Sequence, residues 1–143
     1  MVDAYAFEHE AGWSADGRHV ARARAFAARC LTDHGLLLDV DDVRIVVSEL
    51  VTNAVVHAAT AFTVNLTRLD GVLTVTVADG SHVRPHQFPP VDGFSTQGRG
   101  LRLVEALSSS WGVTDQAGGK AVWATFEVSG GTRIPGPKVG SPS

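Results

Sequence analysis

The spacing of apolar residues along the first part of the chain predicts two amphipathic helices. The first follows Ser14 or Asp16, either of which suits a helix N-cap, and ends at Gly35. The second begins near Asp39 or Asp41, because an acidic side chain suits the positive end of the helix dipole. The apolar positions expected to face the core are Val20, Ala23, Phe26, Ala27 and Leu31 in the first helix, and Val43, Val47, Leu50, Val51, Ala54 and Ala58 in the second.

Strict alternation of apolar and polar residues predicts strands further along the chain. Phe62–Thr67 and Leu73–Val77 alternate on either side of Asp70-Gly71. This pair of residues favours the positive φ angles of a type I′ turn, so the two segments should form a hairpin. The other expected strands are Tyr5–Glu10 and a second hairpin of Trp111–Thr114 and Ala121–Val128, joined through Gly118-Gly119.

Between the two hairpins, the segment from Gly80 to Gly98 contains three prolines and has no apolar period. A long loop of this kind inside a compact domain is usually functional or mobile. A shorter helix is predicted from Arg99 to about Leu107. These elements together predict an α+β fold with helices packed on one face of a sheet. Residues 129–143 are rich in Gly, Pro and Ser, so we expect them to form a disordered tail.

Composition narrows the class of protein. A chain of 143 residues with 44% hydrophobic residues fits one domain with a single core. Its net charge of −3 does not provide the excess of positive charge that attracts nucleic acid, so we expect no direct nucleic-acid binding. One cysteine, Cys30, forms no internal disulfide and is expected in the core, and the chain shows neither a signal peptide nor a long apolar span. We therefore expect a cytoplasmic protein without membrane contact.

Three polar residues on the second helix could carry chemistry. Glu49, Asn53 and His57 recur every four residues and so drift only about forty degrees per step around the helix. A carboxylate on that face could accept a proton, and a carboxamide oxygen is a ligand that Mg²⁺ prefers. The alternative is a solvated helix edge, with His57 taken alone as a capping or packing residue.

Two further motifs follow the second helix. Asp79 ends an alternating strand and precedes Gly80, so its carboxylate could accept a hydrogen bond from an exocyclic amine while a flat ring approaches the glycine. The segment Gly98-Arg99-Gly100 opens a helix, where free backbone N–H groups can hold an anion. Taken alone, the first motif is better interpreted as an ordinary turn, and the second fits an ordinary junction between a loop and a helix at least as well.

In combination and in this order, these motifs resemble the ATP-binding domain shared by gyrase, large dimeric heat-shock chaperones, histidine kinases and mismatch-repair proteins. The helix sequence SELVTNAVVHA, residues 48–58, is similar to that of the small anti-sigma factor serine kinases. The resemblance extends from about Arg18 to Val128. It implies a two-layer sandwich with a mixed, mostly antiparallel sheet, and an ATP-binding domain that spans residues 1–128.

The resemblance also implies roles for single residues. Glu49 would be the catalytic base that activates a serine or threonine hydroxyl, and Asn53 would hold the Mg²⁺ that bridges the ATP phosphates. The segment from Ser81 to Gln97 would be the ATP lid, while Gly119–Trp123 is taken as structural. Asp79 and Gly80 would meet the adenine, and Gly98, Arg99 and Gly100 would hold the phosphates. The remaining residues expected to bind ATP are His57 and Leu101.

The function implied by the resemblance is an ATP-dependent serine/threonine protein kinase of the anti-sigma type. Such a protein would bind a sigma factor, phosphorylate an antagonist protein and form a homodimer. The alternative is a nucleotide-binding interaction module in which ATP organises a partner surface without phosphate transfer. A scaffold that has lost nucleotide binding is a third hypothesis, which the retention of all four motifs in order disfavours.

Overall fold

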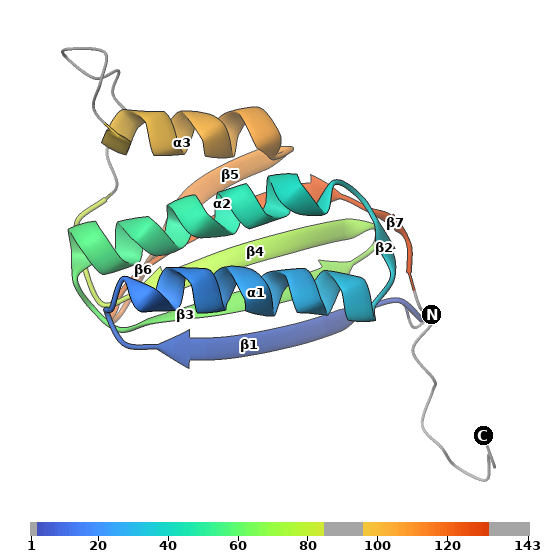
Figure 1. The fold of residues 1–143 in the computed structure, drawn as a ribbon, viewed down its shortest axis with the longest axis horizontal. Helices are drawn as coiled ribbons and strands as arrows, with labels where there is room; N and C mark the ends of the chain where they lie inside the picture. The colour runs from blue at the N-terminus through green and yellow to red at the C-terminus, as the bar shows by residue number, and fades with distance from the viewer. Residues whose placement is uncertain (1–2, 85–95, 132–143) are drawn as a thin grey trace, which may run out of the picture.

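The structure is a computed structural model that describes residues 3–84 and 96–131. It has two layers, with three helices on one side and a five-stranded sheet on the other (Figure 1). The α+β fold with helices on one face of the sheet is therefore confirmed. Within the described residues, no helix is long and apolar enough to cross a membrane.

The sheet is built from two hairpins and one added edge strand. Its order is β1-β3-β4-β6-β5, and every pairing is antiparallel, so none of the parallel pairing expected of a mixed sheet is found among the described strands. Asp70 and Gly71 both have positive φ, 52° and 76°, as a type I′ turn requires. The bounds are β1 Phe7–Trp13, β3 Phe62–Leu69, β4 Val72–Asp79, β5 Ser110–Gln116 and β6 Gly119–Glu127.

Alternation along the strands fixes which face of the sheet is buried. Side chains two residues apart share a face, so the fully buried Val64 and Val77 mark the face that the helices cover. Threonines occupy many of the intervening positions on the uncovered face. The helices are α1 Arg18–Asp33, α2 Val40–Thr52 and α3 Thr96–Leu107, and the buried side chains that α1 and α2 contribute are Ala23, Ala27, Cys30, Leu31, Val43, Val46, Val47, Leu50 and Val51.

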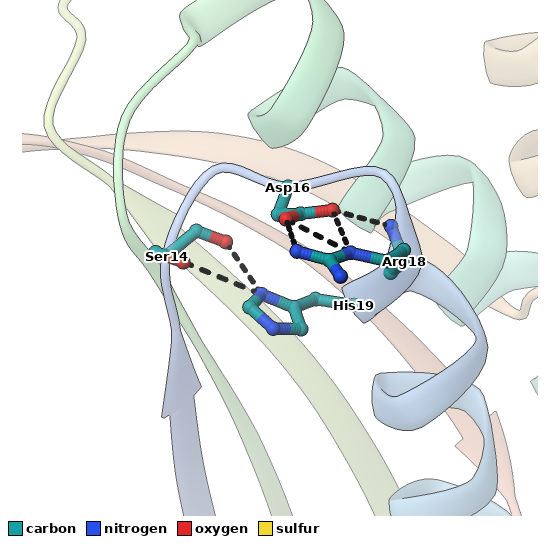
Figure 2. Close-up of polar contacts among 4 residues, drawn as sticks. All are labelled: Ser14, Asp16, Arg18 and His19. Atoms are coloured by element: carbon teal, nitrogen blue, oxygen red, sulfur yellow. Dashed lines mark hydrogen bonds and ion pairs between the residues drawn. The ribbon is translucent and has the colours of Figure 1, made fainter.

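The turn between β1 and α1 differs from the prediction at the helix cap. Neither Ser14 nor Asp16 is the N-cap; this position is Gly17, which makes no side-chain cap bond. The Asp16 carboxylate instead accepts the backbone N–H of Arg18 at 2.9 Å and pairs with the guanidinium at 2.7 Å (Figure 2). His19 Nδ1 donates to the Ser14 carbonyl at 2.9 Å. The acidic side chain therefore closes the turn that precedes the helix.

The second helix begins as predicted but does not continue as an α-helix to Ala58. Asp39 caps α2 by accepting the backbone N–H groups of Asp41 and Asp42. At Asn53 the helix widens into a π-helix, η1 (Asn53–Ala58), closed by a 2.9 Å bond from the Ala59 N–H to the Ala54 carbonyl. π-Helical turns are rare in proteins, and those that occur are often found at functional sites.

Two short strands extend the ordered part of the chain beyond the predicted boundary at residue 128. Leu36–Leu37 (β2) pairs with Ser129–Gly130 (β7), so the expected tail begins with ordered residues. The buried Arg68 explains the extension, because its guanidinium donates to the Gly130 carbonyl at 2.7 Å. The rest of the predicted tail from residue 132 lies outside the described residues.

Candidate active site

Three segments that the sequence singled out lie at one end of the molecule. In Figure 1 the end of α2 with η1, the end of β4 and the beginning of α3 are all at the left. The chain contacts agree, because η1 packs against β4 and α2 packs against α3. The fold therefore brings the regions of Glu49, Asn53 and Asp79 to the same end.

Glu49 lies on α2, one helical turn before the π-helix, and its side chain is half-buried. Burial raises the pKa of this carboxyl above its ordinary value of 4.5, because the charged form loses water. A carboxylate with a raised pKa is a stronger proton acceptor than a solvated one. The position and environment of Glu49 therefore suit a general base.

Asn53 is the residue at which the helix changes from α to π. Its backbone N–H is used, since it donates to the carbonyls of Glu49 and Leu50. Its side-chain Nδ2 is buried, and no hydrogen-bond partner for it is found among the described residues. A buried polar atom without a partner is costly, so this carboxamide fits a polar ligand that is not part of the chain.

The chemistry of that carboxamide fits a phosphate group with its metal ion. The amide nitrogen can donate to a phosphate oxygen, while the amide oxygen is a donor of the kind that Mg²⁺ takes. Glu49 one turn earlier would add a negative charge near the same ion. Asn53 is therefore a residue that could hold Mg²⁺. No group of three or more His, Cys, Asp or Glu side chains within the described ranges could hold a metal by itself.

Asp79 is the last residue of β4, and it points to the face that the helices cover. Phe62, Asp79 and Lys120 lie side by side in register and share this face with the buried Val77, two residues earlier. The Asp79 side chain is only 3% exposed, and its Oδ1 accepts the backbone N–H of Ser81 at 2.8 Å. The Asp-Gly-Ser turn is thus a fixed strand end with a buried carboxylate.

Gly80 is held by a residue that the sequence did not single out. Its backbone N–H donates to the hydroxyl of Thr60 at 2.9 Å, and Thr60 lies just after the π-helix. This bond ties the end of β4 to the segment that carries Asn53. Thr60 has no local sequence signal for such a role, because the contact joins two segments that are twenty residues apart.

The structure also places Lys120 against Asp79, although the sequence suggested only a structural hairpin there. The Lys120 ammonium lies 3.0 Å from both oxygens of the Asp79 carboxylate. Next to it, Gly119 has no room for a side chain, because a Cβ atom would lie 2.8 Å from the Asp79 carbonyl carbon and from the Gly80 Cα. The start of β6 is therefore fitted to the end of β4.

The predicted phosphate motif lies partly outside the described residues. The helix α3 begins at Thr96, earlier than expected, so Gly98, Arg99 and Gly100 lie in its first turns and only their helical backbone is described. Leu101 is 1% exposed and points into the protein interior. Of the predicted lid, residues 85–95 lie outside the described part, while Arg84 at its start pairs with Asp115 at 2.9 Å.

His57 lies in the last turn of η1, and its side chain is exposed. It follows Asn53 on the π-helix, where the changed winding alters the spacing assumed for an α-helix. Its assignment to the ATP site stays a prediction.

The arrangement defines a two-layer α+β domain, with its candidate site between the helices and the end of a buried strand. The family model of the histidine kinase-like ATPase domain matches residues 13–126. The chain belongs to this family.

One solved structure shows the fold over nearly the whole chain. It is that of the RsbU and RsbW domains of Rv1364c from Mycobacterium tuberculosis, with a TM-score of 0.62 and 24% sequence identity. The match covers 91% of this chain and 35% of that one, so the protein spans about a third of the length of this relative. No curated protein matches the chain.

Proposed function

We propose that the protein binds ATP together with Mg²⁺ at the end of the molecule where η1, β4 and α3 meet. The observation that carries this proposal is the buried Nδ2 of Asn53 at the start of the π-helix, which has no hydrogen-bond partner among the described residues. Asn53 would hold Mg²⁺ and contact the phosphates, Asp79 and Gly80 would meet the adenine ring, and the N-terminal turns of α3 would face the phosphates. Membership of an ATPase family supports the same ligand.

The second part of the proposal is phosphate transfer to a protein. Glu49 takes the proton of a serine or threonine hydroxyl while that oxygen bonds to the γ-phosphorus. The bond from the γ-phosphorus to its bridging oxygen breaks, and ADP leaves. The raised pKa of Glu49 supports the assignment, since an acceptor of higher pKa drives the proton transfer better.

The third part concerns partners. The family includes anti-sigma factor kinases of the RsbW type, and the helix sequence of residues 48–58 resembles theirs. We propose that a sigma factor and an antagonist protein are the partners and that the antagonist is the phosphate acceptor. A homodimer belongs to the same proposal, and light scattering on the purified chain tests it.

Transfer of labelled γ-phosphate from ATP to candidate antagonist proteins tests the kinase assignment. Glu49→Gln should abolish the transfer while ATP still binds. Glu127→Gln is the matched control, because Glu127 is an exposed glutamate at the far end of β6 and should leave the transfer intact. Transfer that persists in Glu49→Gln contradicts the role given to Glu49. ATP binding without transfer to any antagonist would favour the nucleotide-binding interaction module.

A further inference from the structure

A fully buried ion pair lies at the end of β4. The side chains of Lys120 and Asp79 are 4% and 3% exposed, and they come from neighbouring strands at directly opposed positions. Taking two charges out of water is expensive, and apolar residues of similar volume are often as stable or more so. Packing alone therefore does not explain this ion pair. Its position beside the candidate ATP site suggests a role in binding the nucleotide.

The Lys120 ammonium is held by Asp79 and by the Ser81 backbone. The ammonium lies 3.0 Å from each Asp79 oxygen and 3.3 Å from the Ser81 carbonyl oxygen. A lysine ammonium has three donors and no acceptor. Two of them are used in hydrogen bonds within the protein, and the ion pair with Oδ2 holds the ammonium against the carboxylate.

The Asp79 carboxylate is used unequally. Oδ1 accepts two hydrogen bonds, one from the Ser81 N–H and one from Lys120, whereas Oδ2 has only the ion-pair contact with Lys120 among the described residues. Each carboxylate oxygen can accept about two hydrogen bonds. The pair therefore keeps hydrogen-bond acceptor capacity for a ligand on Oδ2.

We infer that Lys120 is a positioning residue for base recognition, which holds Asp79 as a fixed acceptor that admits a 6-amino purine and disfavours a 6-oxo purine. This inference rests on the proposed function. An exocyclic amine donates to Oδ2, but a 6-oxo group brings a second acceptor against a negative charge. Without Lys120, the carboxylate loses the ion pair that fixes its orientation, so the preference would weaken.

Binding of ATP and of ITP, its 6-oxo analogue, tests the inference by calorimetry. Because hydrogen bonds to charged groups contribute about 1.5–3 kcal/mol, wild-type protein should bind ATP at least about tenfold more tightly than ITP. In Lys120→Met this ratio should fall to within about threefold. In a protein that already carries Asp79→Asn, adding Lys120→Met should leave the ratio unchanged. The inference is overturned if Lys120→Met binds ATP and ITP with the same affinity ratio as wild type. It is also overturned if Lys120→Met changes this ratio equally in the wild-type and Asp79→Asn proteins.

Lys120→Gln provides a second variant, since it keeps a hydrogen-bond donor and removes the charge; its ratio should lie between those of wild type and Lys120→Met. A measurement on the unaltered protein makes the test independent of folding. Lys120 and Lys138 are the only lysines, so lysine labelled with the heavy nitrogen isotope gives two side-chain signals. The Lys120 signal should shift on saturation with ATP and shift differently with ITP.

A Lys120 signal that responds identically to both nucleotides contradicts the inference. The outcomes also separate it from the proposed function. Wild-type protein that binds neither nucleotide refutes the proposed function itself. Wild-type protein that binds ATP, with a ratio insensitive to Lys120, refutes only the inference.

Discussion

Gly119→Ala is the substitution for which the structure makes its sharpest stability prediction. Gly119 is the first residue of β6, and an added Cβ atom would overlap the carbonyl oxygen of Asp79. It would also lie 2.8 Å from the Asp79 carbonyl carbon and the Gly80 Cα. All three are backbone atoms, so no change of rotamer relieves the contact, and the two strands must move apart where Asp79 lies.

The magnitude follows from the distances. Ordinary van der Waals contact begins at 3.4 Å, so the backbone at Gly80 has to shift by at least 0.6 Å, the difference between 3.4 and 2.8. Overpacking usually costs 1–3 kcal/mol, and because rigid backbone is involved we expect a loss of about 3 kcal/mol in the free energy of unfolding. For a domain of this size the midpoint of thermal unfolding should fall by roughly 10 °C.

Urea and thermal unfolding of matched variants measure this effect. Gly118→Ala is the control, because a Cβ atom there meets nothing within 4 Å, and its free energy of unfolding should stay within about 0.5 kcal/mol of wild type. The folded fraction of Gly119→Ala should also bind ATP more weakly, because Asp79 is displaced. Equal stability of the two alanine variants would refute the close fit between β6 and the end of β4.

Three further substitutions probe the helix that carries the candidate site and its end. Glu49→Gln should raise the free energy of unfolding at neutral pH, because the raised pKa of Glu49 means that the folded state disfavours the charged carboxylate. Urea unfolding should show that this gain in stability disappears as the pH falls through the raised pKa towards 4.5. Phosphate transfer by the unaltered protein should rise with pH over the same range, because the base must be deprotonated. Ala59→Gly should stabilise by about 0.5–1 kcal/mol in thermal unfolding, because Ala59 has a positive φ of 55°, whereas Ala58→Gly within η1 should destabilise by a similar amount.

The sequence predicted those parts of the fold whose cause is local. The hairpin turn depends on Asp70 and Gly71 themselves, and the cap of α2 on the carboxylate of Asp39, so both follow from a few neighbouring residues. The π-helix could not be predicted in this way. Its wider winding starts at Asn53 with no Gly or Pro nearby to mark it, and the bond from the Ala59 N–H to the Ala54 carbonyl depends on where the chain must turn into β3.

The candidate site divides in the same manner. Glu49, Asn53 and Asp79 stand within short motifs, and the fold brings their segments to one end of the molecule. Lys120 carries no motif, because its importance comes from the register of β6 on β4, forty-one residues away from Asp79. Long-range pairing of this kind needs the sheet order, which the alternation of apolar residues does not contain.

The most direct test of the central claim is calorimetric titration of the protein with ATP in the presence and absence of Mg²⁺. Unaltered protein should bind ATP with an affinity that rises when Mg²⁺ is added. Asn53→Ala should remain folded, because it removes a buried amide nitrogen that has no partner among the described residues, and should lose this dependence on Mg²⁺. Absence of ATP binding by the unaltered protein, or the same Mg²⁺ dependence in Asn53→Ala, would contradict the account.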